Sequence, residues 1–203
     1  MVARGDLGVE MPPEEVPIIQ KRLVDACRNQ GKPIVVATQM LDSMINSPSP
    51  TRAEASDVAT AVFDAVDCVM LSAETASGKF PIKSVQIMDR IIRGVENDNS
   101  YRQMLNSKKV KLEETTSDAI SSAASQVVKT VLAKAIFTYT RSGGTAIRAA
   151  RERPTVPIIG LSPERLTARQ LSLIWGVHNI HALEPKSFSG MIENACELAK
   201  REK

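Results

Sequence analysis

Short apolar runs alternate with helical patterns along the first hundred residues of the chain. Residues 1–3, 34–37 and 68–71 are each three or four apolar residues long, the length of a short strand buried on both faces. The helical patterns that follow these runs cover about residues 13–29, 52–63 and 82–105. This alternation is typical of parallel βα units, so the sequence predicts an α/β fold.

Two local signals support these boundaries. Gly31 follows the first helical pattern, where glycine relieves the strain of the left-handed residue that ends a helix. Thr51 and Glu54 stand three residues apart at the start of the second pattern and predict a capping box. We therefore expect a helix to begin at Arg52.

The second half of the chain predicts a separate α/β unit. Residues 106–116 are polar, rich in Lys and Glu, and lack an apolar stripe, which favours a linker. After them we expect strands at 135–138, 156–161 and 177–183 and helices at about 117–132, 165–173 and 187–200, with another helix following the loop at 141–145. The predicted organisation is a first domain at 1–105, a linker at 106–116 and a second domain at 117–203.

Composition and charge exclude several classes of protein. Hydrophobic residues make up 43% and charged residues 24%, as in ordinary globular proteins. The net charge of +3 comes without any basic run, which gives no electrostatic case for nucleic acid. No apolar stretch is long enough to span a membrane, and Arg4 and Asp6 interrupt any apolar core of a signal peptide. Cys27, Cys68 and Cys196 lack metal-ligand spacing, which favours reduced thiols in a cytoplasmic protein.

Polar residues follow each of the three predicted strands of the first domain. In a βα barrel, catalytic groups lie on the loops at the C-terminal ends of the strands. The first such loop, predicted from Arg4 onward, holds Gly5 and Asp6, whose carboxylate is a donor suited to Mg²⁺ and whose loop amides could bind an anion. The alternative is that Asp6 is only a turn or cap residue.

The other two strand ends leave similar alternatives open. Thr38 could donate its hydroxyl to a substrate carboxylate, or could only satisfy the local backbone. Ser72 and Glu74 could handle a proton near a reacting centre. Equally, Ser72 could cap a turn and Glu74 could pair with a surface lysine. Three weak signals at equivalent strand ends support one another.

The order of these motifs resembles the pyruvate kinase family. The segments MVARGDLGVEMP and GKPIVVATQMLDSMINSPSPTRAEASDVATAVFDAVDCVMLSAETASGKFP are similar to the second half of that family's barrel. The later segment FTYTRSGGTAIRAARERPTVPIIGLSPERLTARQLSLIWGV resembles its C-terminal domain. The resemblance implies the last three βα units of a (β/α)8 TIM barrel, followed by a separate α/β domain.

The resemblance also implies an activity and roles for individual residues. Pyruvate kinases transfer a phosphoryl group from phosphoenolpyruvate to ADP in glycolysis, with Mg²⁺ or Mn²⁺ and usually K⁺. Asp6 matches the family's divalent-metal aspartate. Gly5, Asp6 and Thr38 match its substrate-carboxylate site. Ser72 lies where the family has a serine proposed to relay a proton to the enolate, with Glu74 beside it; Arg52 lies in a segment to which we give a structural role.

The same resemblance implies that parts of the enzyme are outside this chain. It places the catalytic lysine, the second metal carboxylate, the K⁺ ligands and a lid domain before Met1, and further strands after Lys203. We therefore expect the chain to begin within a domain and to lack appreciable activity by itself. Family members are usually homotetramers, and the sequence does not decide whether this chain keeps that assembly.

The loop at residues 140–145 is a candidate phosphate site. Hydroxyls, a cation and glycine amides at the start of a helix suit a phosphate group, and the loop resembles the family's site for sugar-phosphate activators. The candidate effector-binding residues are Thr140, Arg141, Ser142, Gly143, Gly144 and Thr145. The alternative is an ordinary βα turn, and the sequence does not identify an effector.

Two other functions compete with the fragment of a glycolytic kinase. One is a non-catalytic module that binds phosphate ligands or supports assembly, favoured by the loop at 140–145. The other is a different barrel enzyme acting on phosphoenolpyruvate or pyruvate. The second α/β domain and the segment TRAEASDVA argue against this last alternative.

Overall fold

The computed structural model describes residues 1–108, 114–185 and 187–201. The chain divides into two compact units, Met1–Lys111 and Leu112–Lys203, and each is described here by itself. Both units are α/β with parallel strands, which confirms the fold class at that level. No helix in the described part of the chain is both long enough and apolar enough to cross a membrane.

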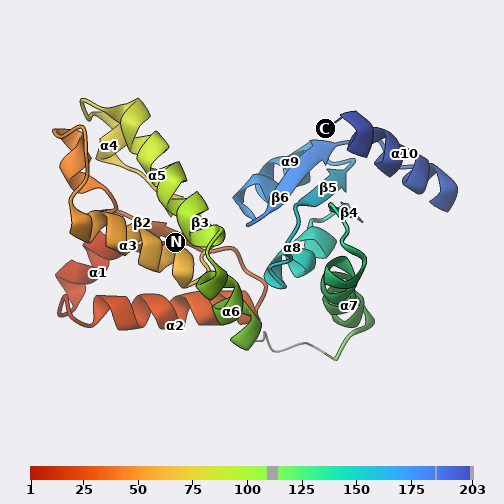
Figure 1. The fold of residues 1–203 in the computed structure, drawn as a ribbon, viewed down its shortest axis with the longest axis horizontal. Helices are drawn as coiled ribbons and strands as arrows, with labels where there is room; N and C mark the ends of the chain where they lie inside the picture. Colours follow the sequence, from red (N-terminus) through yellow and green to blue (C-terminus); the bar gives the residue numbers. More distant parts are fainter. Residues whose placement is uncertain (109–113, 186, 202–203) are drawn as a thin grey trace. The chain divides into compact units, whose positions relative to one another are not determined.

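The first unit is built on a three-stranded parallel sheet in the order β1-β2-β3, of which Figure 1 labels β2 and β3. Its strands are β1 (Val2–Ala3), β2 (Val35–Ala37) and β3 (Cys68–Met70). Its helices are α1 (Arg4–Glu10), α2 (Val16–Asn29), the 3-10 helix η1 (Asp42–Ile45), α3 (Arg52–Phe63), α4 (Ala73–Ala76), α5 (Pro81–Glu96) and α6 (Asn99–Ser107). The three strands predicted from the sequence are thus confirmed, each two or three residues long.

The central strand and the loop after it lie in the core of this unit. Val36 of β2 packs with Val24 of α2, Val58 of α3 and Met88 of α5. The segment that follows β2 adds Met40, Leu41 and Met44, all fully buried, to the same cluster. A loop whose apolar side chains lie in the core has a well-defined backbone, and this one carries the candidate Thr38.

Two predicted segments of the first unit were wrong. Residues from Arg4 onward form helix α1 and not a loop, although Gly5 and Gly8 disfavour a helix. Leu7 packs against the core, so tertiary contact outweighs the low propensity. The single helix predicted at 82–105 is two helices, because Asp98 accepts a hydrogen bond from the Ser100 amide and starts α6 anew.

The second unit holds another three-stranded parallel sheet, in the order β4-β5-β6 (Figure 1). Its strands are β4 (Ile136–Tyr139), β5 (Ile158–Ser162) and β6 (Val177–His181). Its helices are α7 (Thr116–Val131), α8 (Gly144–Arg151), α9 (Arg165–Gln170), the 3-10 helix η2 (Leu171–Leu173) and α10 (Phe188–Arg201). Of the linker predicted at 106–116, residues 109–113 lie outside the described part.

A buried ion pair joins the first two helices of the second unit. Asp118 of α7 is fully buried and accepts a hydrogen bond of 2.5 Å from Arg151 of α8, which is also buried. Arg148 of α8 approaches the same carboxylate at 3.4 Å. Because a buried charge without its partner is strongly destabilising, this contact fixes α8 and the loop before it against α7.

The capping box predicted for α3 is confirmed and extends to a second segment. Thr51 Oγ1 accepts from the Glu54 amide at 3.2 Å, and the Glu54 carboxylate accepts from the Thr51 amide at 2.7 Å. The same carboxylate also accepts from the Ser43 amide at 2.6 Å and the Ser43 hydroxyl at 2.5 Å. Burial of Glu54 raises its pKa, but the hydrogen bonds from Ser43 and Thr51 together outweigh it and hold the pKa below the ordinary value of 4.5.

We predict that Glu54→Gln destabilises the first unit by about 1–2 kcal/mol at pH 7, because charge-assisted hydrogen bonds are lost at a helix start. Since the folded pKa lies below 4.5, the carboxylate's contribution is present above that pH and lost as the pH falls through the folded pKa. Urea denaturation of both proteins between pH 3 and pH 7 measures this. The exposed Glu14→Gln serves as the control, and a Glu54→Gln difference that does not shrink in acid would contradict the assignment.

Candidate functional site

The parallel sheet of the first unit brings the three predicted strand ends to one edge. Val2 pairs with Val36 and Ala3 with Ala37, so the residues after β1 and β2 are neighbours. Ala37 also pairs with Met70, which places the end of β3 on the other side of β2. Residues that are more than thirty positions apart along the chain therefore meet beyond the carboxyl ends of the strands.

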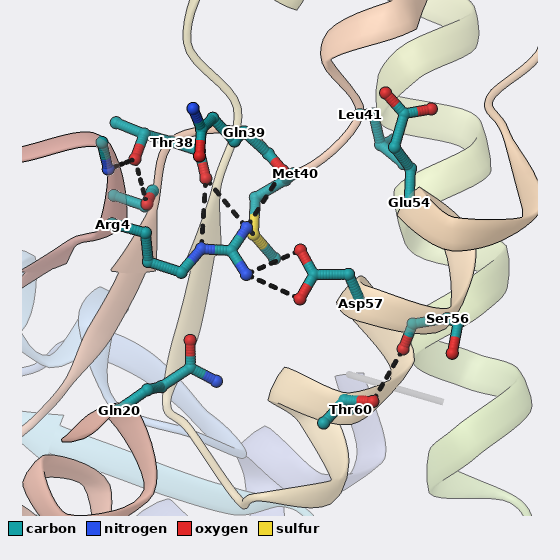
Figure 2. A network of polar contacts seen from close by, with 12 residues as sticks. Arg4, Gln20, Thr38, Gln39, Met40, Leu41, Glu54, Ser56, Asp57 and Thr60 are labelled. Atoms are coloured by element: carbon teal, nitrogen blue, oxygen red, sulfur yellow. Dashed lines mark hydrogen bonds and ion pairs between the residues drawn. The ribbon is translucent and has the colours of Figure 1, made fainter. Parts of the chain in front are cut away.

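Gly5 and Thr38 are in direct contact at this edge. The Gly5 amide donates to Thr38 Oγ1 at 2.8 Å, and the Thr38 hydroxyl donates to the Ala37 carbonyl at 2.6 Å. Figure 2 shows both hydrogen bonds on the Thr38 side chain. The Thr38 hydroxyl oxygen thus accepts the hydrogen bond of the Gly5 amide in this structure. An oxygen of a bound carboxylate could accept that hydrogen bond in its stead.

The backbone after β2 has an unusual conformation. Thr38 has φ 68° and Gln39 has φ 54°, the left-handed region that is rare for any residue other than glycine and a genuine outlier for a β-branched threonine. Such residues cost about 1–3 kcal/mol each and gather at functional sites, where surrounding contacts hold them. The two carbonyl groups of this turn point toward Arg4.

Arg4 is the functional candidate that sequence reasoning missed. Its guanidinium donates to the Thr38 carbonyl at 2.9 Å and the Gln39 carbonyl at 3.0 Å. It also donates to the Asp57 carboxylate of α3 at 2.6 Å (Figure 2). An arginine directly after a buried strand was the available signal, but its partners are 34 to 53 residues away in the sequence.

Glu74 is buried and serves the backbone of two strand ends. Its side chain is only 2% exposed, and one oxygen accepts from the Ser72 amide at 2.7 Å while the other accepts from the Leu41 amide at 3.1 Å. The carboxylate therefore ties the segment after β3 to the segment after β2. Ser72 itself is half-buried and lies at the N-terminal end of the short helix α4.

Asp6 lies in the first turn of α1, and its side chain is exposed. A hard divalent cation needs several oxygen ligands, and Asp6 supplies one carboxylate. Among the described residues, no group of three or more His, Cys, Asp or Glu side chains is placed to hold a metal ion. The donors present are thus too few for a complete site, and no chemical step through a metal follows from them.

The loop before α8 in the second unit is held by its own hydroxyl groups. The Gly143 amide donates to Thr140 Oγ1 at 2.9 Å, and the Thr167 hydroxyl donates to the Arg141 carbonyl at 2.8 Å. Gly143 has φ 89°, and a Cβ there would lie 3.4 Å from Leu171, so both conformation and space favour glycine. Ser142 and Thr145 stay exposed while Thr140 is buried within the turn.

A hollow of about 240 Å³ lies beside this loop and is lined by Thr140, Arg141 and Glu184, among others. Arg141 and Glu184, both well exposed, form an ion pair at the hollow. The Tyr139 hydroxyl donates to the Met191 carbonyl at 2.8 Å, and burial raises the pKa of this tyrosine. The lining of the hollow is therefore mainly apolar, and its cationic side chain, Arg141, is paired with Glu184.

Comparisons with known proteins cover almost the whole chain. The family model for the pyruvate kinase barrel domain matches residues 1–85, and the model for the pyruvate kinase alpha/beta domain matches residues 118–203. A pyruvate kinase of Methylorubrum extorquens is 51% identical over 203 residues, which are 100% of this chain and 42% of the relative. One of Agrobacterium vitis is 49% identical over 98% of this chain and 42% of the relative.

A solved structure agrees with these matches. The crystal structure of a pyruvate kinase from Cryptosporidium parvum superposes with a TM-score of 0.92 at 41% identity. The match covers 98% of this chain and 41% of that one. The chain thus spans about two fifths of the length of the relatives that it matches.

We predict that Glu74→Gln destabilises the first unit by about 1–3 kcal/mol, because an amide offers one acceptor where the carboxylate serves two buried amides. Unfolding in urea, followed by circular dichroism, measures the change; the single tryptophan, Trp175, lies in the other unit. Glu10→Gln, which alters an exposed side chain, should change stability by less than about 0.5 kcal/mol. Equal effects of the two substitutions would show that Glu74 does not tie the strand ends.

Proposed function

Because the chain belongs to the pyruvate kinase family, we propose that it forms part of an enzyme that transfers a phosphoryl group from phosphoenolpyruvate to ADP, giving pyruvate and ATP in glycolysis. The observation that carries this proposal is the contact between the Gly5 amide and Thr38 Oγ1 at adjacent strand ends. Its three parallel βα units would be the last three of an eight-stranded barrel, followed by the separate α/β domain.

The Gly5–Thr38 contact is suited to a substrate carboxylate. A carboxylate accepts hydrogen bonds only, and an amide and a hydroxyl on neighbouring strands can both donate to it. A bound carboxylate would take the place of Thr38 Oγ1 at the Gly5 amide, and the displaced hydroxyl would turn from the Ala37 carbonyl to the ligand, so that both groups donate to it. In phosphoryl transfer, catalysis comes mainly from such positioning and from neutralisation of charge.

Asp6 would supply one ligand to a Mg²⁺ or Mn²⁺ ion, with the other ligands coming from groups that the described residues do not contain. Such an ion, when bound, offsets the negative charge of the transferred phosphate and of the developing enolate. The exposure of Asp6 at the strand-end edge supports this role. The resemblance places the ligands of the K⁺ ion outside this chain.

Ser72 and Glu74 have different parts in the proposal. Ser72 is the candidate for relaying a proton to the enolate, since it follows β3 at the same edge and is half-buried. Glu74 accepts the Ser72 amide, which supports a role in placing the serine backbone. Neither residue needs to form a covalent bond with substrate, because phosphoryl transfer in this reaction is between substrates.

The second unit would bind an effector. The exposed residues Arg141, Ser142 and Thr145, together with the amide of Gly144 at the start of α8, suit the phosphate of a sugar-phosphate activator, and Gly143 would shape the turn. Thr140 would act indirectly, since its hydroxyl already holds the Gly143 amide. A homotetrameric assembly and a cytoplasmic location, both usual in the family, complete the proposal.

We predict that phosphoenolpyruvate, titrated into the ¹⁵N-labelled chain, shifts the amide signals of Gly5, Asp6 and Thr38 before others. Thr38→Val, which keeps the shape but removes the hydroxyl, should weaken binding about tenfold, the usual effect of losing a hydrogen bond to a charged group. Thr60→Val on α3, where the hydroxyl bonds only to the Ser56 carbonyl, is the matched control. Shifts confined to other residues would refute the proposed carboxylate site.

A sugar bisphosphate should bind the second unit weakly, with amide shifts centred on residues 141–145. We expect Arg141→Ala to weaken this binding by about tenfold, because the cation contributes a charge-assisted hydrogen bond. Calorimetry or NMR titration measures the change, and Arg169→Ala, an exposed arginine on α9, is the control. If Arg141→Ala leaves the affinity unchanged, the loop is an ordinary βα turn.

A further inference from the structure

Arg4 is a charged side chain with an unusually complete set of partners. Its relative exposure is only 9%, and its guanidinium contacts the carbonyls of Thr38 and Gln39, the sulfur of Met40 at 2.8 Å and the carboxylate of Asp57. A buried charge is costly unless it is paired and hydrogen-bonded, and these contacts meet both needs. Three of the four partners are consecutive residues, so the guanidinium is fitted to one short turn.

The turn that Arg4 contacts needs an external support. Thr38 and Gln39 are consecutive non-glycine residues with positive φ, and left-handed backbone is unfavourable for each. In that conformation both carbonyl groups turn to the same side, where one guanidinium nitrogen, Nη2, donates to both. Relaxation of either residue to the β region would move its carbonyl away from Arg4 and break a charge-assisted hydrogen bond.

Asp57 fixes the guanidinium from the opposite side. Arg4 Nη1 lies 2.6 Å from the carboxylate oxygens of Asp57, and this carboxylate is about one third exposed, at 37%. Asp57 lies on α3, whose start is held by the capping box of Thr51 and Glu54. Arg4 therefore connects the turn after β2 to helix α3, as Figure 2 shows.

Arg4 and its neighbour contact Thr38 at two points. The Arg4 side chain holds the Thr38 carbonyl, while the backbone amide of Gly5, the next residue, donates to Thr38 Oγ1. We infer that Arg4 is a positioning residue that sustains the left-handed conformation of Thr38 and Gln39, with Asp57 as its anchor, and so holds the Thr38 hydroxyl against the Gly5 amide. The part of this inference that concerns ligand binding rests on the proposed carboxylate site.

The left-handed backbone has a spectroscopic signature that a general loss of stability does not reproduce. At positive φ the amide proton of a residue lies close to its own α-proton, which gives a strong nuclear Overhauser effect within the residue. In the full chain we expect this strong signal for Thr38 and Gln39. Pyruvate, a small carboxylate without a phosphate, is the probe for binding, and thermal unfolding is recorded alongside.

Arg4→Met keeps an unbranched side chain of similar stem and removes the guanidinium donors. We expect it to weaken the two intraresidue signals to those of ordinary backbone and to raise the dissociation constant of pyruvate about tenfold. Arg4→Lys should restore part of the affinity, to within about threefold of the wild type, because an ammonium can donate to the carbonyls but has no second nitrogen to reach Asp57. Asp57→Asn should fall between the two.

Arg93→Met is the matched control, because Arg93 forms an exposed ion pair with Asp89 on α5. It should change neither the intraresidue signals nor the affinity. If Arg4→Met retains both signals and binds pyruvate as the wild type does, the inference is wrong, whatever its thermal stability. If Arg4→Met does not fold, unchanged signals and affinity in both Arg4→Lys and Asp57→Asn would overturn it equally.

The same experiment separates this inference from the proposed function. A wild-type chain that does not bind pyruvate refutes the carboxylate site. The intraresidue signals of the Arg4 variants then still decide whether the arginine holds the turn. Loss of the signals in Arg4→Met supports the role of Arg4 in holding the turn, and retention of the signals contradicts that role.

Discussion

The parallel pairing of β1, β2 and β3 is the constraint on which the first unit depends. Its register sets Ala3, Ala37 and Met70 side by side, so the chain leaves all three strands at the same edge. Parallel strands need long crossover connections, and here helices α2 and α3 supply them. Every candidate residue of the first unit lies within a few positions of these strand ends.

The segment after the central strand is held from both neighbouring strands. Arg4, which follows β1, donates to the carbonyls of residues 38 and 39. Glu74, which follows β3, accepts the amide of Leu41. The Arg4 cation thus satisfies carbonyl oxygens at the start of this segment, and the Glu74 anion satisfies an amide at its end. These charge-assisted hydrogen bonds account for the burial of both charges.

The second unit uses neutral groups for a similar purpose. In its βα turn after β4, the hydroxyl of Thr140 accepts the Gly143 amide, and the Thr167 hydroxyl donates to the Arg141 carbonyl. These contacts leave the Arg141 side chain at the surface, where Glu184 pairs with it. The first turn is therefore organised by buried charges, whereas the second is organised by hydroxyl groups and has its charged side chain at the surface.

The sequence by itself determined the features that depend on near neighbours. The buried runs predicted the parallel strands, and Thr51 with Glu54 predicted the start of α3, because these signals act over three or four residues. Local pattern also placed Gly5, Thr38 and Ser72 at strand ends, and the order of the motifs indicated the family. The prediction from local pattern was wrong where distant contacts decide: residues 4–10 are helical, and Leu7 of this helix packs on the core.

Only the tertiary structure decided what the charged residues do. Local pattern gives Arg4 no role and allows Glu74 a proton-transfer role or a surface ion pair, yet both are buried and hold backbone groups about 33 to 35 residues away. No short-range pattern records such partners, since the sheet register brings them together. The sequence therefore predicted the strand ends as a candidate site, while long-range hydrogen bonds determined the conformation of the turn at its centre.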